Sequence, residues 1–196
     1  MNPESEIDVE KAAELTLFFS QVEINRKSQL HFRVNYLALL NLHTDVENTV
    51  KSIKDIIATE QKEMLERDTQ LLFQARNWRF HLVACGVMLA GLNSAELLDQ
   101  LWIVLQRGSW VAPQIAATAF LLDAAFTERA LEAITREDFN EQSVVALAQL
   151  LSENFSVNFT EEQLARVQKA KLRDSVKSDK IAVTWAEKAR LLFPAT

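Results

Sequence analysis

Hydrophobic residues in the first part of the chain recur at the three- and four-residue spacing of amphipathic helices. The first predicted helix begins near Asp8, an N-cap type of residue, and is apolar around much of its circumference from Val9 to Val22. The second is predicted to begin at Ser28 and to continue through about Leu40. Because the connection between them is short, we expect these two helices to pair antiparallel.

A third helical segment is predicted to begin at Thr44, where Thr44 and Glu47 fit the capping-box pattern. It reaches about Ala75, either as one long helix or as two helices broken near Thr59. Its charged middle, residues 60–68, is interpreted as a solvated face.

Helix starts then recur at a fixed interval. Ser94, Thr127 and Thr160 are 33 residues apart, and each is an N-cap type of residue followed by an acidic residue within two positions. The helices in front of them also repeat, because Trp78 and Trp110 lie 32 residues apart. Such a period indicates stacked pairs of helices.

The predicted pairs occupy residues 76–174. Gly91 and Gly108 suit the left-handed residue that ends a helix. Pro113 is poorly placed if its helix starts near Trp110, so this helix either begins later, near Ala112, or has a bent first turn. The expected helices are Trp78–Ala90, Ser94–Gln106, Trp110–Ala125, Thr127–Ile134, Glu141–Glu153 and a sixth from Thr160.

Local patterns support some of these starts. Thr160 and Gln163 complete a capping box, and Phe126 before Thr127 suits a hydrophobic staple with Leu131. Residues 175–196 begin with a polar link and end in an amphipathic helix anchored by Trp185, which we interpret as a cap on the repeats.

The paired helices resemble the repeats of HEAT-like and armadillo-like α-solenoid proteins over residues 77–170. The fold class expected is therefore all-α, with residues 1–196 as a single domain: N-terminal helices over 1–75, three helix pairs over 76–174 and a C-terminal capping helix over 175–196. The resemblance implies a right-handed stack whose concave face binds another molecule, most often a protein. It implies no chemistry of its own.

The composition agrees with an all-α fold and also bears on the location and the chemistry of the protein. Only three glycines and three prolines occur in 196 residues, so little sheet is expected, and the single cysteine, Cys85, lies in an apolar run where a buried thiol is the ordinary interpretation. The start lacks the regions of a signal peptide, and no apolar stretch approaches about 18 residues, which predicts a cytoplasmic protein without a membrane span. Metal and cofactor motifs are absent from the sequence, so neither group is expected.

The candidate recognition residues cluster where the first repeated helix begins. Arg76, Trp78, Arg79 and His81 follow one another closely, and Trp110 occupies the equivalent place one repeat later. These residue types are enriched at binding hot spots. The alternative is that both tryptophans seal the core between repeats while the arginines cover its rim.

Asp123 stands in an otherwise apolar run and is expected near the core, where a carboxylate must be paired. Arg79 and Arg107 are its predicted partners. A structural link between Asp123 and an arginine is favoured over a functional carboxylate. Trp102, flanked by apolar residues, is predicted to lie in the core.

The function expected from these patterns is a non-catalytic module for protein–protein interaction. One version is an inhibitor or immunity-type binder of a basic protein, because the net charge of −6 disfavours nucleic acid and anionic lipid. A homo-oligomer formed through the apolar segment Val9–Val22 is a further possibility.

The alternative from another class is an enzyme that resembles HEAT-like DNA glycosylases. That resemblance implies aromatic residues and one carboxylate on a basic concave face. The residues of suitable type are Trp78, Trp110, Trp185 and Asp123, with Arg76, Arg79 and Arg107 for phosphate contacts. The acidic net charge and the scattered basic residues depart from this pattern.

Overall fold

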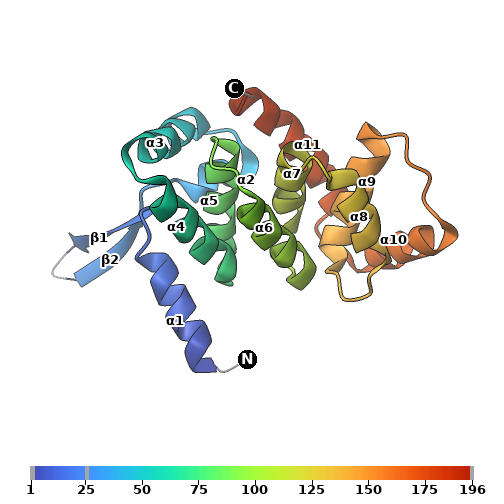
Figure 1. Ribbon diagram of the computed structural model, residues 1–196, viewed down its shortest axis with the longest axis horizontal. Helices are drawn as coiled ribbons and strands as arrows, with labels where there is room; N and C mark the ends of the chain where they lie inside the picture. The colour runs from blue at the N-terminus through green and yellow to red at the C-terminus, as the bar shows by residue number, and fades with distance from the viewer. Residues whose placement is uncertain (1–2, 25–26, 195–196) are drawn as a thin grey trace. The chain divides into compact units, whose positions relative to one another are not determined.

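A computed structural model describes residues 3–24 and 27–194 of the protein. Within these residues the chain forms eleven α-helices and one two-stranded antiparallel sheet, so the all-α class is confirmed (Figure 1). No helix in this part of the chain has the length and apolar character needed to cross a membrane. Contacts divide the chain into two compact units, Met1–Leu97 and Leu98–Thr196, and their boundary falls within the helix Ala95–Arg107.

Unit 1 contains the hairpin and the first helices. Its central helix, α5, is buried on nearly all sides and contacts α2, α3 and α4. The elements are α1 (Pro3–Glu14), β1 (Phe19–Ile24), β2 (Lys27–Phe32), α2 (Tyr36–Asn41), α3 (Val46–Thr59), α4 (Lys62–Gln74), α5 (Trp78–Leu89) and the start of α6 (Ala95–Arg107).

The hairpin is the main departure from the sequence prediction. The helix expected from Val9 to Val22 ends at Glu14, and the helix expected from Ser28 to Leu40 is replaced by β2 and the short α2. The strands pair from Phe19 with Phe32 to Ile24 with Lys27. Apolar and polar residues alternate over much of both strands, and this two-residue period favours a strand.

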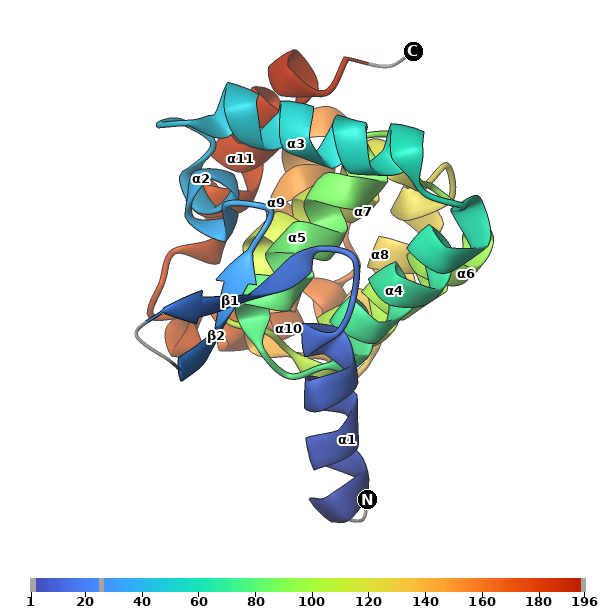
Figure 2. The same cartoon turned by 90° about the vertical axis from the view of Figure 1, so that its left-hand side faces the viewer.

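Long-range contacts of aromatic residues secure the hairpin. The ring of Phe19 lies 4.7 Å from that of Phe32 and 5.0 Å from that of Phe80 on α5. Figure 2 shows the hairpin beside α5. Phe18 and Phe19 are buried inside unit 1, so these two side chains are not exposed for the predicted oligomer contact. The homo-oligomer remains a prediction.

The third predicted segment consists of two helices, because the chain leaves the helical conformation at Glu60 and Gln61 between α3 and α4. The capping box expected at Thr44 does not form. The N-cap is Asp45, in a left-handed conformation and without a side-chain capping bond.

The charged middle of this segment is not wholly solvated. Asp68 is buried, accepts a hydrogen bond from the Leu17 backbone N–H at 2.8 Å and pairs with Arg67. It therefore ties α4 to the chain that precedes the hairpin.

The close packing of α5 depends on one glycine. A Cβ atom at Gly86 would lie 3.0 Å from Ile53 Cδ1 and 3.1 Å from Leu39 Cδ1, so the missing side chain lets α2 and α3 approach. Gly91, at φ 119°, follows α5 as predicted. Cys85 is buried in the same helix, also as predicted.

Unit 2 has a core of three mutually contacting helices, α7, α9 and α11, with α8 and α10 packed against α9 (Figure 1). Pro113 lies in the first turn of α7, so the later start near Ala112 is the correct alternative. The elements are the rest of α6, then α7 (Ala112–Leu122), α8 (Phe126–Thr135), α9 (Glu141–Asn154), α10 (Glu161–Arg173) and α11 (Ser178–Leu192).

Of the helix starts predicted in unit 2, that of α10 is confirmed and that of α8 is wrong. The capping box of Thr160 and Gln163 is present at α10. Thr127 lies inside α8, whose N-cap is Ala125, so the expected staple register of Phe126 is wrong. Trp185 is buried and anchors α11 as predicted, but α11 packs on both α7 and α9 rather than on the last helix pair alone. The right-handed solenoid remains a prediction.

Candidate functional site

The predicted recognition cluster of unit 1 is partly formed. We call Phe32, Tyr36, Trp78 and Arg79 the Trp78–Arg79 surface. The Arg79 guanidinium lies 4.7 Å from the ring centre of Trp78 and 5.3 Å from that of Tyr36, which itself meets Trp78 edge-on at 5.6 Å. Asn77 caps α5 and fixes the direction in which Trp78 and Arg79 leave the helix.

The remaining predicted residues are arranged differently. His81 is only 1% exposed and its Nε2 lies 2.8 Å from the Ala75 carbonyl oxygen, so its predicted place on a recognition surface is wrong. Arg76 is exposed, and its backbone N–H donates to the Glu10 carboxylate. In unit 2, Trp110 is 56% exposed, which excludes a core-sealing role, and Arg107 is exposed at the end of α6.

Asp123 is nearly buried, with 9% of the residue exposed, and forms the C-cap of α7. Its carboxylate accepts hydrogen bonds from the Trp102 indole at 2.7 Å and the Ala125 backbone N–H at 2.9 Å, and Arg129 lies 3.4 Å away. The structural Asp–Arg link therefore exists. Its arginine is Arg129, one turn into α8, and not Arg79 or Arg107.

Arg129 connects this buried carboxylate to the surface. Its guanidinium lies 4.9 Å from the Trp102 ring centre and forms a 3.0 Å ion pair with Asp99. We call Trp102, Asp123 and Arg129 the Trp102 cluster. Three hydrogen-bonding or charged groups converge on one carboxylate here, so the position of Arg129 is strongly determined.

A cleft of about 450 Å³ lies beside this cluster, between α6 and α8. We call it the α6–α8 cleft. Ile103, which is 48% exposed, presents an aliphatic side chain on the α6 wall. The full lining is Asp99, Trp102, Ile103, Gln106, Arg129, Glu132, Ala133, Arg136 and Phe139.

The cleft also contains a second pairing of arginine with an aromatic ring. Arg136 lies 5.4 Å from the Phe139 ring centre and donates two hydrogen bonds to Asp138, at 2.8 and 3.0 Å. These bonds raise the pKa of Arg136, and the same contact lowers the pKa of Asp138. Gln106 donates to Asp138 at 2.6 Å, so this carboxylate links α6 to the end of α8.

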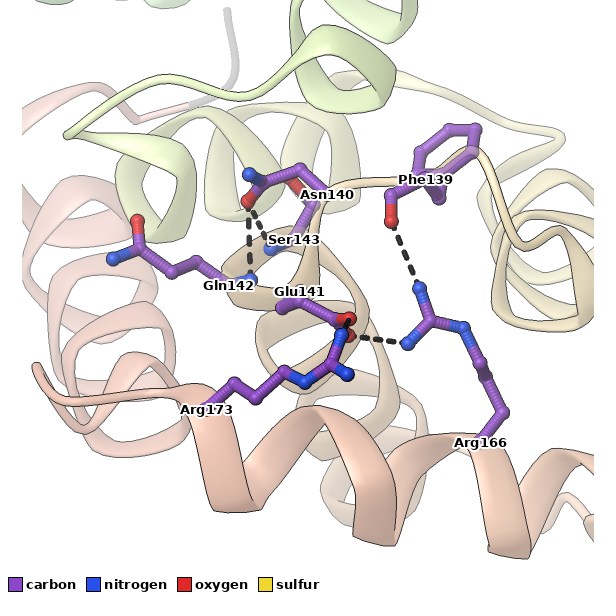
Figure 3. Close-up of polar contacts among 7 residues, drawn as sticks. All are labelled: Phe139, Asn140, Glu141, Gln142, Ser143, Arg166 and Arg173. Atoms are coloured by element: carbon purple, nitrogen blue, oxygen red, sulfur yellow. Dashed lines mark hydrogen bonds and ion pairs between the residues drawn. The ribbon is translucent and has the colours of Figure 1, made fainter.

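The turn that carries Phe139 is held from below by α10 (Figure 3). Arg166 Nη2 donates to the Phe139 carbonyl at 2.8 Å and Nη1 pairs with Glu141, which also pairs with Arg173 at 3.0 Å. Burial opposes ionisation of Glu141, but the bonds and charges of Arg166 and Arg173 outweigh it and lower its pKa. Asn140 caps α9 through the Gln142 and Ser143 N–H groups.

Most residues of the cleft are not among the predicted site residues. Trp102 is buried, as predicted for a core residue, but Ile103, Arg129, Glu132 and Arg136 were not candidates. The sequence does contain a signal for this surface. Asp99, Ile103 and Gln106 recur at helical spacing, so they share one face of a predicted helix whose other apolar residues were assigned to the core.

Unit 1 also has two adjoining hollows beside α3, of about 430 and 440 Å³. They share His31, Arg33 and Ser52 and are lined mostly by polar side chains. They lack the exposed aliphatic residue that distinguishes the α6–α8 cleft.

In the part of the chain that the structure describes, no three His, Cys, Asp or Glu residues are grouped to hold a metal ion. Comparisons of the chain with protein-family models, with curated proteins and with solved structures found no match. The candidate site therefore rests on its own geometry.

Proposed function

We propose that this protein is a non-catalytic module that binds another protein through the α6–α8 cleft. The observation that carries the proposal is the exposed Ile103, set beside Trp102 and Phe139 and flanked by charged side chains from both helices. An apolar centre with a polar rim is the usual composition of a protein-binding patch. The cleft has the volume to receive one or two side chains of a partner.

The polar groups of the cleft suit recognition better than catalysis. Asp123, the most buried of the carboxylates in and beside the cleft, is held by Trp102, Ala125 and Arg129 and is hardly exposed. A general base needs access to its substrate. The ion pairs instead fix the shape of the cleft, which lowers the entropy lost when a partner binds.

The geometry does not favour the glycosylase alternative. Asp123 and Trp185, two of the residues that would face the nucleic acid, are buried in unit 2. The α6–α8 cleft also carries carboxylates on both walls, which repel a phosphate backbone. An inhibitor or immunity-type binder is the version of the protein-binding proposal that agrees with the acidic net charge.

The test is affinity capture followed by mass spectrometry with three proteins: wild type, Ile103→Gln and Leu172→Gln. Leu172 is a matched control, since it is 90% exposed on α10 and does not line the cleft. All three should have the same circular dichroism and the same melting temperature within a few degrees.

We expect wild type and Leu172→Gln to capture the same partner protein and Ile103→Gln to lose it, because an amide buried without a hydrogen-bond partner costs binding free energy. Capture that is equal for all three folded proteins would contradict the proposed site. Loss in both variants would show that the partner contacts a different or much larger surface.

A further inference from the structure

We propose that the α6–α8 cleft receives a cationic side chain, an arginine or lysine, next to an apolar residue of the partner protein. This inference rests on the proposed function and specifies the chemistry of the partner. It follows from two observations: the arginines of the cleft are already bound to carboxylates of the protein, and the walls leave an aliphatic residue and a carboxylate exposed.

Carboxylates outnumber cations around the cleft. Asp99 and Glu132 line it, and Asp123 and Asp138 are paired with its two arginines. Against these four carboxylates stand two guanidinium groups, those of Arg129 and Arg136. The local charge is therefore negative, and a positive side chain is the complementary ligand.

Both arginines are already engaged within the protein. Arg129 is shared between Asp99 and Asp123, and each guanidinium also lies over an aromatic ring. An acidic ligand would have to compete with these intramolecular carboxylates. Arg136 interacts with Glu132 through its charge but is held by Asp138, and no ion pair of Glu132 is found among the described residues. A cationic ligand therefore meets weaker competition at Glu132.

The two lining carboxylates lie on opposite walls of the cleft, Asp99 on α6 and Glu132 on α8. Ile103 lies on the α6 wall, beside Asp99. Arginine and lysine combine an aliphatic stem with a charged end. The stem can pack on Ile103 while the charge lies between the two walls. The apolar neighbour on the partner then packs on the rest of the exposed Ile103 side chain, because Trp102 and Phe139 are each only 6% exposed.

The experiment selects ligands without assuming the natural partner. A random-peptide phage library is panned against the immobilised full-length protein, and enriched peptides are resynthesised and their dissociation constants measured. We expect enrichment of arginine or lysine beside an apolar residue. In the resynthesised peptide, replacing that arginine with citrulline, or acetylating that lysine, removes the charge at nearly constant shape and should weaken binding about tenfold.

Three protein variants locate the contact. Glu132→Gln should weaken binding of the cationic peptide about threefold to fivefold, as expected for one partly exposed charge pair, and Glu132→Lys by tenfold or more. Glu187→Gln is the matched control, because Glu187 is exposed on α11 and outside the cleft. It should leave the dissociation constant unchanged.

The outcomes separate this inference from the proposed function. Peptides that lose binding in Ile103→Gln but show no preference for basic residues, or are acidic, overturn the cationic ligand and leave the cleft as a binding site. Peptides that are basic but bind Glu132→Lys as tightly as wild type also overturn the inference. A library that yields no ligand sensitive to Ile103→Gln overturns both.

Discussion

Each unit of the protein places an arginine on a tryptophan, and the two pairs differ in what lies behind them. In unit 1, Arg79 lies over Trp78 and Tyr36, and no ion pair of Arg79 is found among the residues that the structure describes. In unit 2, Arg129 lies over Trp102 and is also bound to a buried and an exposed carboxylate. The first pair is a surface contact, and the second is a fixed part of the packing.

This contrast indicates which of the two surfaces is preorganised. A cation over an aromatic ring contributes about 0.5–1 kcal/mol at an exposed site and does not fix the long side chain by itself. Adding a nearly buried carboxylate makes removal of either ion costly, because the other would remain buried without its partner. We therefore expect the Trp102 cluster to hold its geometry in the absence of a partner.

The largest effect should follow from Asp123→Ala. This change leaves the Trp102 indole N–H and Arg129 without their acceptor, and the free energy of unfolding should fall by about 3 kcal/mol. Urea denaturation measures it, with Asp55→Ala on an exposed face of α3 as the control. A change below about 1 kcal/mol would show that the carboxylate is not structural.

A smaller effect should separate the two arginines directly. Arg129→Met removes charge-assisted contacts to Asp99 and Asp123 and should cost about 2 kcal/mol, whereas Arg79→Met should cost less than about 1 kcal/mol. Both changes keep a flexible, unbranched side chain that resembles the aliphatic stem of arginine and remove the guanidinium group. If thermal unfolding shows equal losses, the contrast between the two pairs is wrong.

Lowering the pH should reduce the stability of unit 2 by less than either substitution does. The pKa of Glu141 is lowered in the folded protein, so its contribution to stability is present above its ordinary pKa of about 4.5 and is lost as the pH falls below that value. Glu141→Gln should therefore flatten the loss of stability below pH 4.5, measured by denaturation at several pH values. Parallel curves for the variant and the wild type would rule out this linkage.

Much of the helical structure after residue 76 was predictable, because the residues that begin and end these helices act through local contacts. Gly91 and Gly108 have φ values of 119° and 93° after helices that end where the glycines indicated. Thr160 caps α10 with Gln163, as the pattern required. These features depend on neighbouring residues alone.

The N-terminal hairpin was not predictable in the same way. The apolar residues from Val9 to Val22 also fit a helical period, so the sequence favours two structures there. Contact of Phe19 with Phe80, 61 positions away on α5, supports the strand, and no local pattern reveals that contact.

The candidate sites also differ in whether their residues are close together in the sequence. Trp78 and Arg79 are adjacent in sequence, so their cluster was evident, although the burial of His81 was not. Trp102, Asp123 and Arg129 come from α6, the end of α7 and α8. Their meeting depends on how three helices pack, and the sequence therefore suggested the wrong arginine for Asp123.

Gly108 has a consequence for how this sequence can vary over evolution. A Cβ atom there would lie 2.4 Å from Asn140 Nδ2, and Asn140 itself caps α9 and donates its backbone N–H to the Gln106 carbonyl. The end of one helix and the start of another thus share one small space. Relatives should change positions 108 and 140 together or not at all, and a lineage that gains a side chain at 108 should also lose the asparagine cap.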